Sequence, residues 1–174
     1  MIRRLLQAMA IAALLALLWP EFARYRAEYQ LKEVGARMER ALTGKDRGEA
    51  ALQSVSRAQQ LAHSAAAALP GDARAPMLEG IALILMRQGE QAIAVLTAAI
   101  AQGERPEFTI NLGRARSVLG DEVGARRAFL RTAWASPTAI FTLPKATQEQ
   151  LVIEVRELEA ELRAGRLRAP PPLD

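Results

Sequence analysis

Three positions of this chain recur at a spacing of 33 residues, and no other feature of the sequence limits its fold as strongly. The recurring pairs are Gly80 and Gly113, Ala92 and Ala125, and Leu96 and Phe129. A glycine or alanine lets two helix backbones approach closely, and a larger apolar residue fills the groove between neighbouring hairpins. The spacing therefore predicts two stacked helical hairpins within residues 73–137 of an all-α chain.

The second copy resembles a tetratricopeptide repeat (TPR), a family of antiparallel helix pairs. The resemblance rests on residues 106–137, at Leu112, Gly113, Gly120, Asp121, Ala125, Phe129 and Pro137. A degenerate copy covers residues 74–103 and keeps Gly80, Ala92, Leu96 and Ala99. Arg116 and Leu83 stand where the family has aromatic residues, so a generic array of helical hairpins stays open as the alternative. The resemblance implies a curved stack that binds other proteins.

Residues 21–72 predict a long helical hairpin ahead of the repeats. Apolar residues between Phe22 and Leu42 recur at steps of three and four, as they do on one face of a helix. Asp46 and Glu49 form a capping-box pattern that starts a second helix, and this helix ends before Pro70. The hairpin is either a degenerate repeat or an unrelated helix pair, so the stack has about two to three hairpins.

Residues 138–165 predict a connector and then a helix that caps the open end of the stack. Thr147 and Gln150 mark the start of this helix. Its narrow apolar stripe consists of Leu151, Val155, Leu158 and Leu162. Charged residues cover its other faces, as a terminal capping element requires. The proline-rich composition of residues 166–174 favours a disordered tail.

Residues 1–20 predict a signal anchor or transmembrane helix. Arg3 and Arg4 precede an apolar run from Leu5 to Trp19, in which Gln7 is the only polar side chain. The run spans about 22 Å, between the length of a signal-peptide core and that of a helix crossing a hydrocarbon layer of about 30 Å. The residues after the run match a cleavage site poorly. This favours an uncleaved anchor over a removed signal peptide or a buried helix.

The expected location is the bacterial inner membrane, crossed once and contacted through residues 2–22. The basic residues that follow the run outnumber the two arginines before it, and by the positive-inside pattern this places the domain in the cytoplasm. A short basic segment before an apolar run is, however, the layout of an export signal. We therefore expect the domain to be periplasmic.

The composition argues against several kinds of function. Without cysteine, the chain has no disulfide and no thiolate metal site. His63 is the only histidine, and no glycine-rich loop follows a strand, so we expect no metal, no cofactor and no small-molecule substrate. The formal charge of +4 is spread in clusters of mixed sign and gives no reason to expect nucleic acid as a partner. We expect a binding protein and not an enzyme.

The TPR resemblance also implies where a protein or peptide partner binds. Family members hold a peptide on the concave face formed by the first helices of successive hairpins. On this sequence, that face consists of Arg74, Met77, Ile81, Ile84, Glu107, Ile110, Asn111, Arg114 and Ser117. We expect apolar anchors of the peptide in the groove and a carboxylate or backbone carbonyl on Asn111 and Arg114. The alternative is that the apolar residues of this set are simply core.

These features favour a membrane-tethered scaffold or assembly factor for an envelope complex. A tether raises the effective concentration of a binding module for other membrane proteins. A periplasmic holdase-type chaperone for exported polypeptides is one alternative, because an apolar groove would serve it equally well. A structural subunit of an integral membrane complex is another, since Ala8, Ala12, Ala13 and Ala16 form a stripe of small residues in the apolar run.

Overall fold

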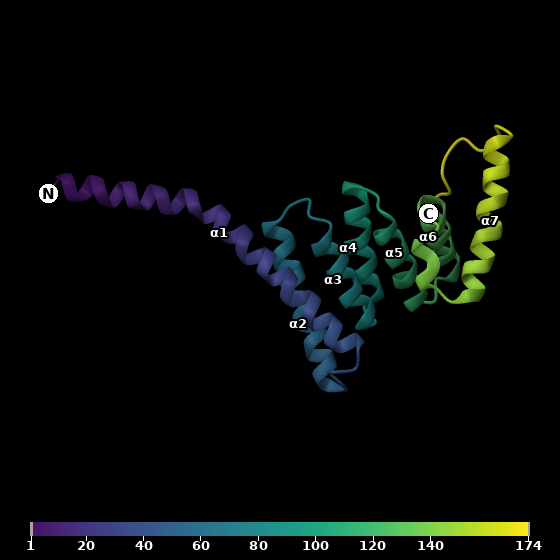
Figure 1. Cartoon of the computed structure of the whole chain (residues 1–174), viewed down its shortest axis with the longest axis horizontal. Helices are drawn as coiled ribbons and strands as arrows, with labels where there is room; N and C mark the ends of the chain where they lie inside the picture. The colour runs from purple at the N-terminus through teal and green to yellow at the C-terminus, as the bar shows by residue number, and fades with distance from the viewer. Residues whose placement is uncertain (1, 174) are drawn as a thin grey trace.

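The computed structural model describes residues 2–173, and within them the chain is helical with no strand (Figure 1). The helices are α1 (Ile2–Leu42), α2 (Glu49–Ala68), α3 (Arg74–Leu85), α4 (Gly89–Gln102), α5 (Pro106–Val118), α6 (Glu122–Ala135) and α7 (Lys145–Arg163), with a short 3-10 helix, η1 (Ala139–Thr142), before α7. Near the start of α1, the side chains of Ile2, Leu5, Leu6, Ala8 and Ala10 lie outside the described part. The expected all-α class is confirmed for the described residues.

Successive helices pack against one another along the chain, so the molecule is a stack of helix pairs. α1 pairs with α2, α3 with α4, and α5 with α6, and α3 also touches the first helices of both neighbouring pairs, α1 and α5. Figure 1 shows the pairs side by side along the long axis, with α7 at the far end. This helical stack is compatible with a repeat-type, solenoid-like fold.

The core consists of several apolar clusters that follow one another along the stack. Between α1 and α2, the buried residues include Val34, Met38 and Leu61. The central cluster joins α3 to α6 and consists of Leu83, Ala92, Leu96, Ala99, Phe108, Leu112, Ala115 and Ala128. The last cluster joins α5 and α6 to η1 and α7, and consists of Ile110, Ala125, Phe129, Ala133, Ile140, Leu143 and Leu151. Each hairpin therefore gains its apolar contacts from its immediate neighbours.

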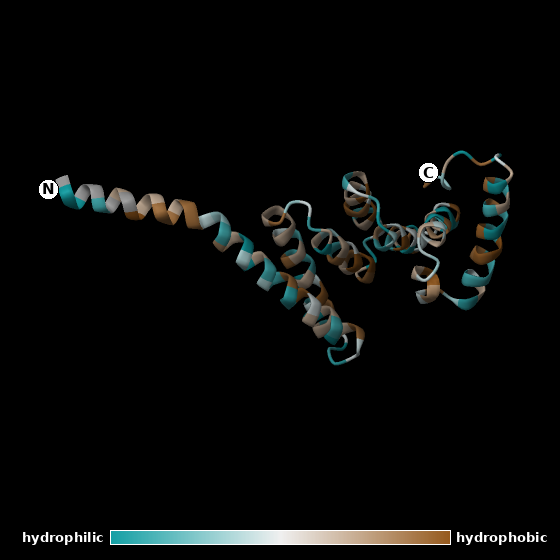
Figure 2. Cartoon of the chain, turned by 45° about the horizontal axis from the view of Figure 1, so that its top comes forward, coloured by the Kyte–Doolittle hydropathy of each residue, from teal (hydrophilic) through white to brown (hydrophobic). Residues whose placement is uncertain are grey.

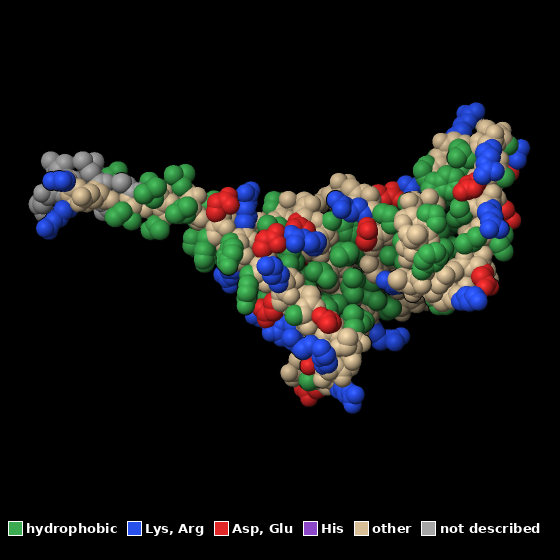
Figure 3. Space-filling view, in the orientation of Figure 1, with side chains coloured by type: hydrophobic (Ala, Val, Ile, Leu, Met, Phe, Trp, Pro, Cys, Tyr) green, Lys and Arg blue, Asp and Glu red, His purple; other side chains and the backbone are tan. Residues whose placement is uncertain are grey.

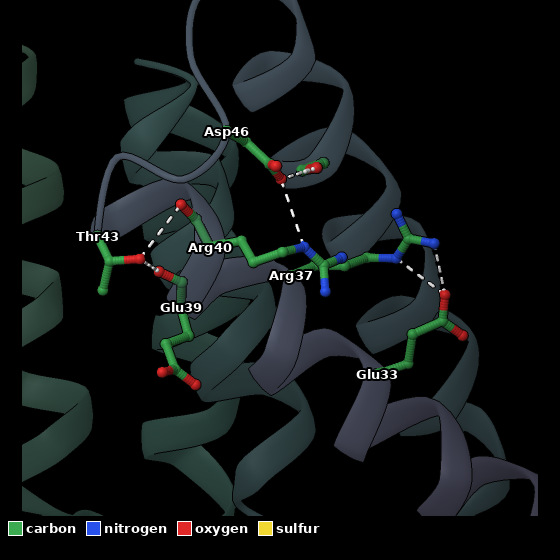
Figure 4. Close-up of polar contacts among 7 residues, drawn as sticks. Glu33, Arg37, Glu39, Arg40, Thr43 and Asp46 are labelled. Atoms are coloured by element: carbon green, nitrogen blue, oxygen red, sulfur yellow. Dashed lines mark hydrogen bonds and ion pairs between the residues drawn. The ribbon is translucent and has the colours of Figure 1, made fainter.

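The turn between α1 and α2 differs from the expected capping box. Gly48 precedes α2 and makes no side-chain cap. Asp46 instead accepts a hydrogen bond of 2.6 Å from Ser54 Oγ, and its carboxylate lies 3.5 Å from Arg40 Nε (Figure 4). Thr43 Oγ1 donates to the Glu39 carbonyl at 2.7 Å, which satisfies a backbone acceptor in the last turn of α1. Asp46 thus fastens the hairpin across its turn instead of capping the second helix.

The first half of α1 extends away from the stack. Among the described side chains of α1, the first buried one is that of Ala27. Figure 2 shows the helix leaving the body of the molecule with apolar residues on its projecting part. The large exposed apolar residues among the described side chains of this part are Met9, Ile11, Leu14, Leu15, Leu17, Leu18, Trp19, Phe22 and Tyr25. Within the part of the chain that the structure describes, none of the helices combines the length and the apolar character that a membrane span requires.

The C-terminal segment returns to the stack after α7. A disordered tail was the expectation for residues 166–174; in the structure, residues 166–173 form neither helix nor strand, and Pro171 is buried. The Pro171 carbonyl accepts a hydrogen bond from α6, and the Leu173 carbonyl accepts one from α5. The segment therefore crosses back over the last helix pair, as Figure 1 shows near the C-terminus.

Candidate functional site

The glycines that define the 33-residue spacing each lie directly against a bulky side chain of the following helix. A Cβ atom added to Gly80 would lie 2.8 Å from Leu96 Cδ2, and one added to Gly113 would lie 2.4 Å from Phe129 Cε1. In each hairpin, the glycine of the first helix thus makes room for the bulky apolar residue of the second. A methyl group at either glycine would overlap the side chain of Leu96 or Phe129, which would have to shift within the packed core.

The remaining residues assigned to repeat packing lie in or beside these contacts. Ala92, Ala99 and Leu112 are buried in the central cluster, and Ala125 is buried with Phe129 in the last cluster. Pro137 is exposed. It follows Ser136, the residue at which α6 ends in extended backbone. These residues form helix contacts and one helix end.

A groove with a volume of about 730 Å³ opens between α5, α6 and the start of α7. Its apolar lining includes Val118, Phe129 and Leu151, and its polar lining includes Arg114, Gln150 and Glu154. We call this space the concave groove. It is large enough for several side chains of an extended or helical peptide.

The structure brings three of the nine predicted partner-binding residues into the concave groove. These are Ile84, Arg114 and Ser117. They come from the last turn of α3 and the second half of α5. The six others are Arg74, Met77, Ile81, Glu107, Ile110 and Asn111, none of which lines this groove. The groove is thus shifted toward the C-terminal end of the predicted face.

Several of the six residues outside the groove contribute to packing. Met77 and Ile81 are half-buried against the clusters of the stack, and Ile110 is buried in the last one. Arg74 bonds to Asp72 and also lies 2.6 Å from Glu28 of α1, so it joins the first two hairpins. Glu107 is exposed at the start of α5. Met77, Ile81 and Ile110 are therefore part of the core, which was the alternative interpretation of the apolar residues in the predicted face.

Arg114 and Arg126 both line the concave groove. The neighbours of Arg114 fix its direction. Nη1 donates to Asn111 Oδ1 at 3.0 Å, and Nη2 donates to Thr142 Oγ1 at 2.6 Å. Asn111 is itself buried and donates to the Glu107 carbonyl at 2.8 Å, so it positions Arg114. Burial lowers the pKa of the Arg114 guanidinium. Among the described residues, no carboxylate forms an ion pair with it.

The second wall of the groove was not foreseen from the sequence. It comes from the end of η1, the connection to α7 and the start of α7, and includes Thr142, Leu143, Thr147 and Leu151. At one end, Arg126 Nη2 of α6 donates a hydrogen bond of 2.7 Å to Glu154 Oε1 of α7, and this bond raises the pKa of Arg126. The apolar stripe of α7 was visible in the sequence, but nothing there told which helices it would face.

The single histidine lies outside the groove, in a link between α2 and α3. His63 Nδ1 lies 2.9 Å from Glu79 Oε1, and Gln59 Nε2 donates to the same oxygen at 2.9 Å. Glu79 is buried, whereas the His63 side chain is 75% exposed. In the described residues no set of three or more histidine, aspartate or glutamate side chains is arranged to hold a metal ion.

The concave groove offers apolar walls and the guanidinium of Arg114, which pairs with no carboxylate of the described residues. Guanidinium groups bind carboxylates and carbonyl oxygens through directed N–H donors. Comparison with known proteins adds no assignment, since no family model, no curated protein and no solved structure matches this chain.

Proposed function

We propose that this protein is a membrane-tethered, TPR-type interaction module, and that it serves as a scaffold or assembly factor for an envelope complex. It binds a segment of a partner polypeptide in the concave groove and performs no catalysis. The observation that carries this proposal is the position of Arg114, a half-buried guanidinium at the wall of a largely apolar groove of about 730 Å³. The proposal includes the TPR assignment, which rests on the spacing of the glycine, alanine and bulky apolar residues.

The partner recognised by such a groove is a peptide segment with apolar side chains and one acceptor. Ile84, Val118 and Phe129 offer apolar surface to the side chains. Arg114 offers its remaining N–H groups to a carboxylate or a backbone carbonyl, and its two hydrogen bonds within the protein hold it in place beforehand. A donor that is fixed before binding loses little conformational entropy when the partner arrives.

The tether in this proposal is the projecting half of α1. Its large apolar side chains are exposed over the part that leaves the stack (Figure 3). Soluble monomers rarely expose so much contiguous apolar surface. We propose that residues 2–22 contact the bacterial inner membrane, with Arg3 and Arg4 at one interface and Trp19 and Phe22 at the other. The helical stack is then periplasmic.

A structural subunit of an integral membrane complex is the second candidate function. The exposed apolar face of α1 favours it, because that face could pack against other helices as well as against lipid. In this case the partner would be held by α1, and changes in the concave groove would leave the association intact.

The test is affinity purification of the full-length protein from gently solubilised membranes. We compare the unsubstituted chain with Arg114→Glu and with Arg127→Glu, an exposed arginine of α6 outside the groove. The proposal predicts one stoichiometric partner, which Arg114→Glu releases and Arg127→Glu retains. A partner that persists with Arg114→Glu would support the structural subunit, and many unfolded clients would support the holdase.

A further inference from the structure

The C-terminal segment occupies a second surface, on the other side of α6 from the concave groove. Phe129 lines the concave groove, whereas Arg131 binds the returning segment. Two residues along an α-helix correspond to a rotation of about 200°, so the two side chains leave α6 on opposite sides. The C-terminal segment therefore leaves the concave groove accessible, and the surface that it covers is a separate site.

Two arginines hold the segment by its backbone carbonyls. Arg131 Nη1 donates to the Pro171 carbonyl at 3.1 Å, and Arg116 Nη1 donates to the Leu173 carbonyl at 2.6 Å. Pro171 is buried, and the Leu173 side chain packs against the central cluster of the stack. Within the described residues, two hydrogen bonds and one apolar contact thus hold the segment. We call this surface the tail site, defined by Arg116, Arg131 and Trp134.

The rest of the protein orients both arginines. Arg131 donates from Nε and Nη2 to the two carboxylate oxygens of Glu104, and these bonds raise its pKa. Arg116 Nη1 also donates to the Gly124 carbonyl at 3.1 Å, at the start of α6. Their directions are therefore set by residues outside the segment, as in a site prepared for a ligand.

The chemistry of the segment complements these donors. Residues 170–172 are three consecutive prolines, which lack a backbone N–H and favour the extended polyproline II conformation. Such a segment presents carbonyl acceptors and almost no donors, while a guanidinium presents donors only. Beside Pro170, a cavity of about 330 Å³ lined by Trp134, Arg105 and Pro106 leaves room for a further side chain. Proline and tryptophan recur together in the recognition of such segments.

We propose that the tail site is a binding site for an extended proline-rich segment carrying an apolar side chain after its prolines, and that residues 170–173 fill it in cis. A segment of the same chemistry on another protein binds there by displacing the tail. The tether of the tail gives it an effective concentration of roughly millimolar, so a competing segment binds tightly only when the tail is weakened. This site is independent of the concave groove and of the function proposed for it.

The test uses the full-length protein in detergent and a fluorescent peptide of residues 164–173 with an amidated C-terminus. Leu173→Lys in the protein weakens its own tail, because a lysine cannot replace the apolar anchor and is repelled by Arg116. We expect the peptide to bind this variant at least about tenfold more tightly than the unsubstituted chain, as measured by fluorescence anisotropy. Equal binding to both proteins, or no binding to the variant, would overturn the proposal.

Two controls separate recognition at the tail site from non-specific binding. Adding Arg131→Gln to the Leu173→Lys protein is expected to abolish binding, whereas adding Arg127→Gln, an exposed arginine on the same helix, leaves it unchanged. The same peptide with lysine in place of Leu173 leaves the protein untouched and is expected not to bind. Binding that survives Arg131→Gln, or that ignores the change in the peptide, would place the segment elsewhere.

Discussion

The close approach of helices at Gly113 is the feature of single residues on which the last hairpin depends most. A Cβ atom there would lie 2.4 Å from Phe129 Cε1, well inside ordinary contact. We predict that Gly113→Ala destabilises the fold by about 1–3 kcal/mol, because the phenyl ring has to move within a packed cluster. Urea unfolding followed by circular dichroism measures the loss.

Gly35 provides the matched control for this substitution. It also lies inside a helix, but a Cβ atom there would meet nothing within 4 Å. Gly35→Ala is therefore expected to stabilise the protein by about 0.5–1 kcal/mol, through the higher helix propensity of alanine. Equal effects of the two substitutions would show that the contact with Phe129 does not hold the hairpin.

The pair formed by Glu104 and Arg131 makes stability depend on pH. The hydrogen bond from Arg131 lowers the pKa of Glu104 below its ordinary value of 4.5. A lowered folded-state pKa contributes stability that is fully present above about pH 4.5 and is lost as the pH falls through the folded value. We predict that Glu104→Gln narrows the difference between the urea midpoints measured at about pH 6 and about pH 3. An unchanged difference would contradict this assignment.

Sequence reasoning succeeded for contacts between helices and was less successful for polar side chains. The spacing pointed to glycine and bulky apolar residues as packing positions, with the bulky residue expected between neighbouring hairpins. In the structure, Leu96 and Phe129 lie against Gly80 and Gly113 within their own hairpins. Asn111 was expected to bind a partner, but it is buried and bonded to Arg114 and to the Glu107 carbonyl. The hydrogen-bond partners of a side chain depend on contacts between elements, which a residue pattern does not contain.

Among the elements, α7 closes both the stack and the concave groove. Leu151 is its one fully buried residue and lies in the last cluster. We predict that Leu151→Ala costs about 2–5 kcal/mol of the docking free energy of α7, because it leaves a cavity in that cluster. Hydrogen exchange is then expected to accelerate over residues 145–163 while α3 and α4 stay protected.

Ile153 serves as the comparison for Leu151. It lies two residues further along α7, and its side chain is 56% exposed. Ile153→Ala is expected to leave the exchange of α7 almost unchanged. If the two substitutions accelerate exchange equally, α7 does not dock through Leu151.

The helix pattern was predictable, but several element ends were not. Periodicity and turn residues indicated the helices between residues 74 and 135, because each apolar stripe has a helical period. The prediction that Asp46 caps α2 was wrong, because its carboxylate accepts a hydrogen bond from Ser54 and pairs with Arg40 across the hairpin. The docking of residues 170–173 was also missed, because their composition alone favours disorder and their binding site comes from α5 and α6.

At the scale of the whole molecule, the stack is a row of helix pairs with α1 projecting at one end and α7 at the other (Figure 1). The projecting part of α1 exposes apolar side chains, and the concave groove lies beside the start of α7. Contacts run between neighbours, as in solenoid proteins, where stability is approximately a sum of local terms. The groove is thus held away from the proposed membrane contact, and this separation leaves space for a partner segment beside the membrane.

The central claim, that a partner segment lies in the concave groove, is tested most directly by site-specific photocrosslinking in intact membranes. A photoreactive phenylalanine replaces Ser117, which lines the groove, or Thr97, which is exposed on α4 outside it. The account predicts one discrete adduct from position 117, none of that size from position 97, and loss of the adduct when Arg114→Glu is added. The same adduct from both positions, or an adduct from position 117 that survives Arg114→Glu, would contradict it.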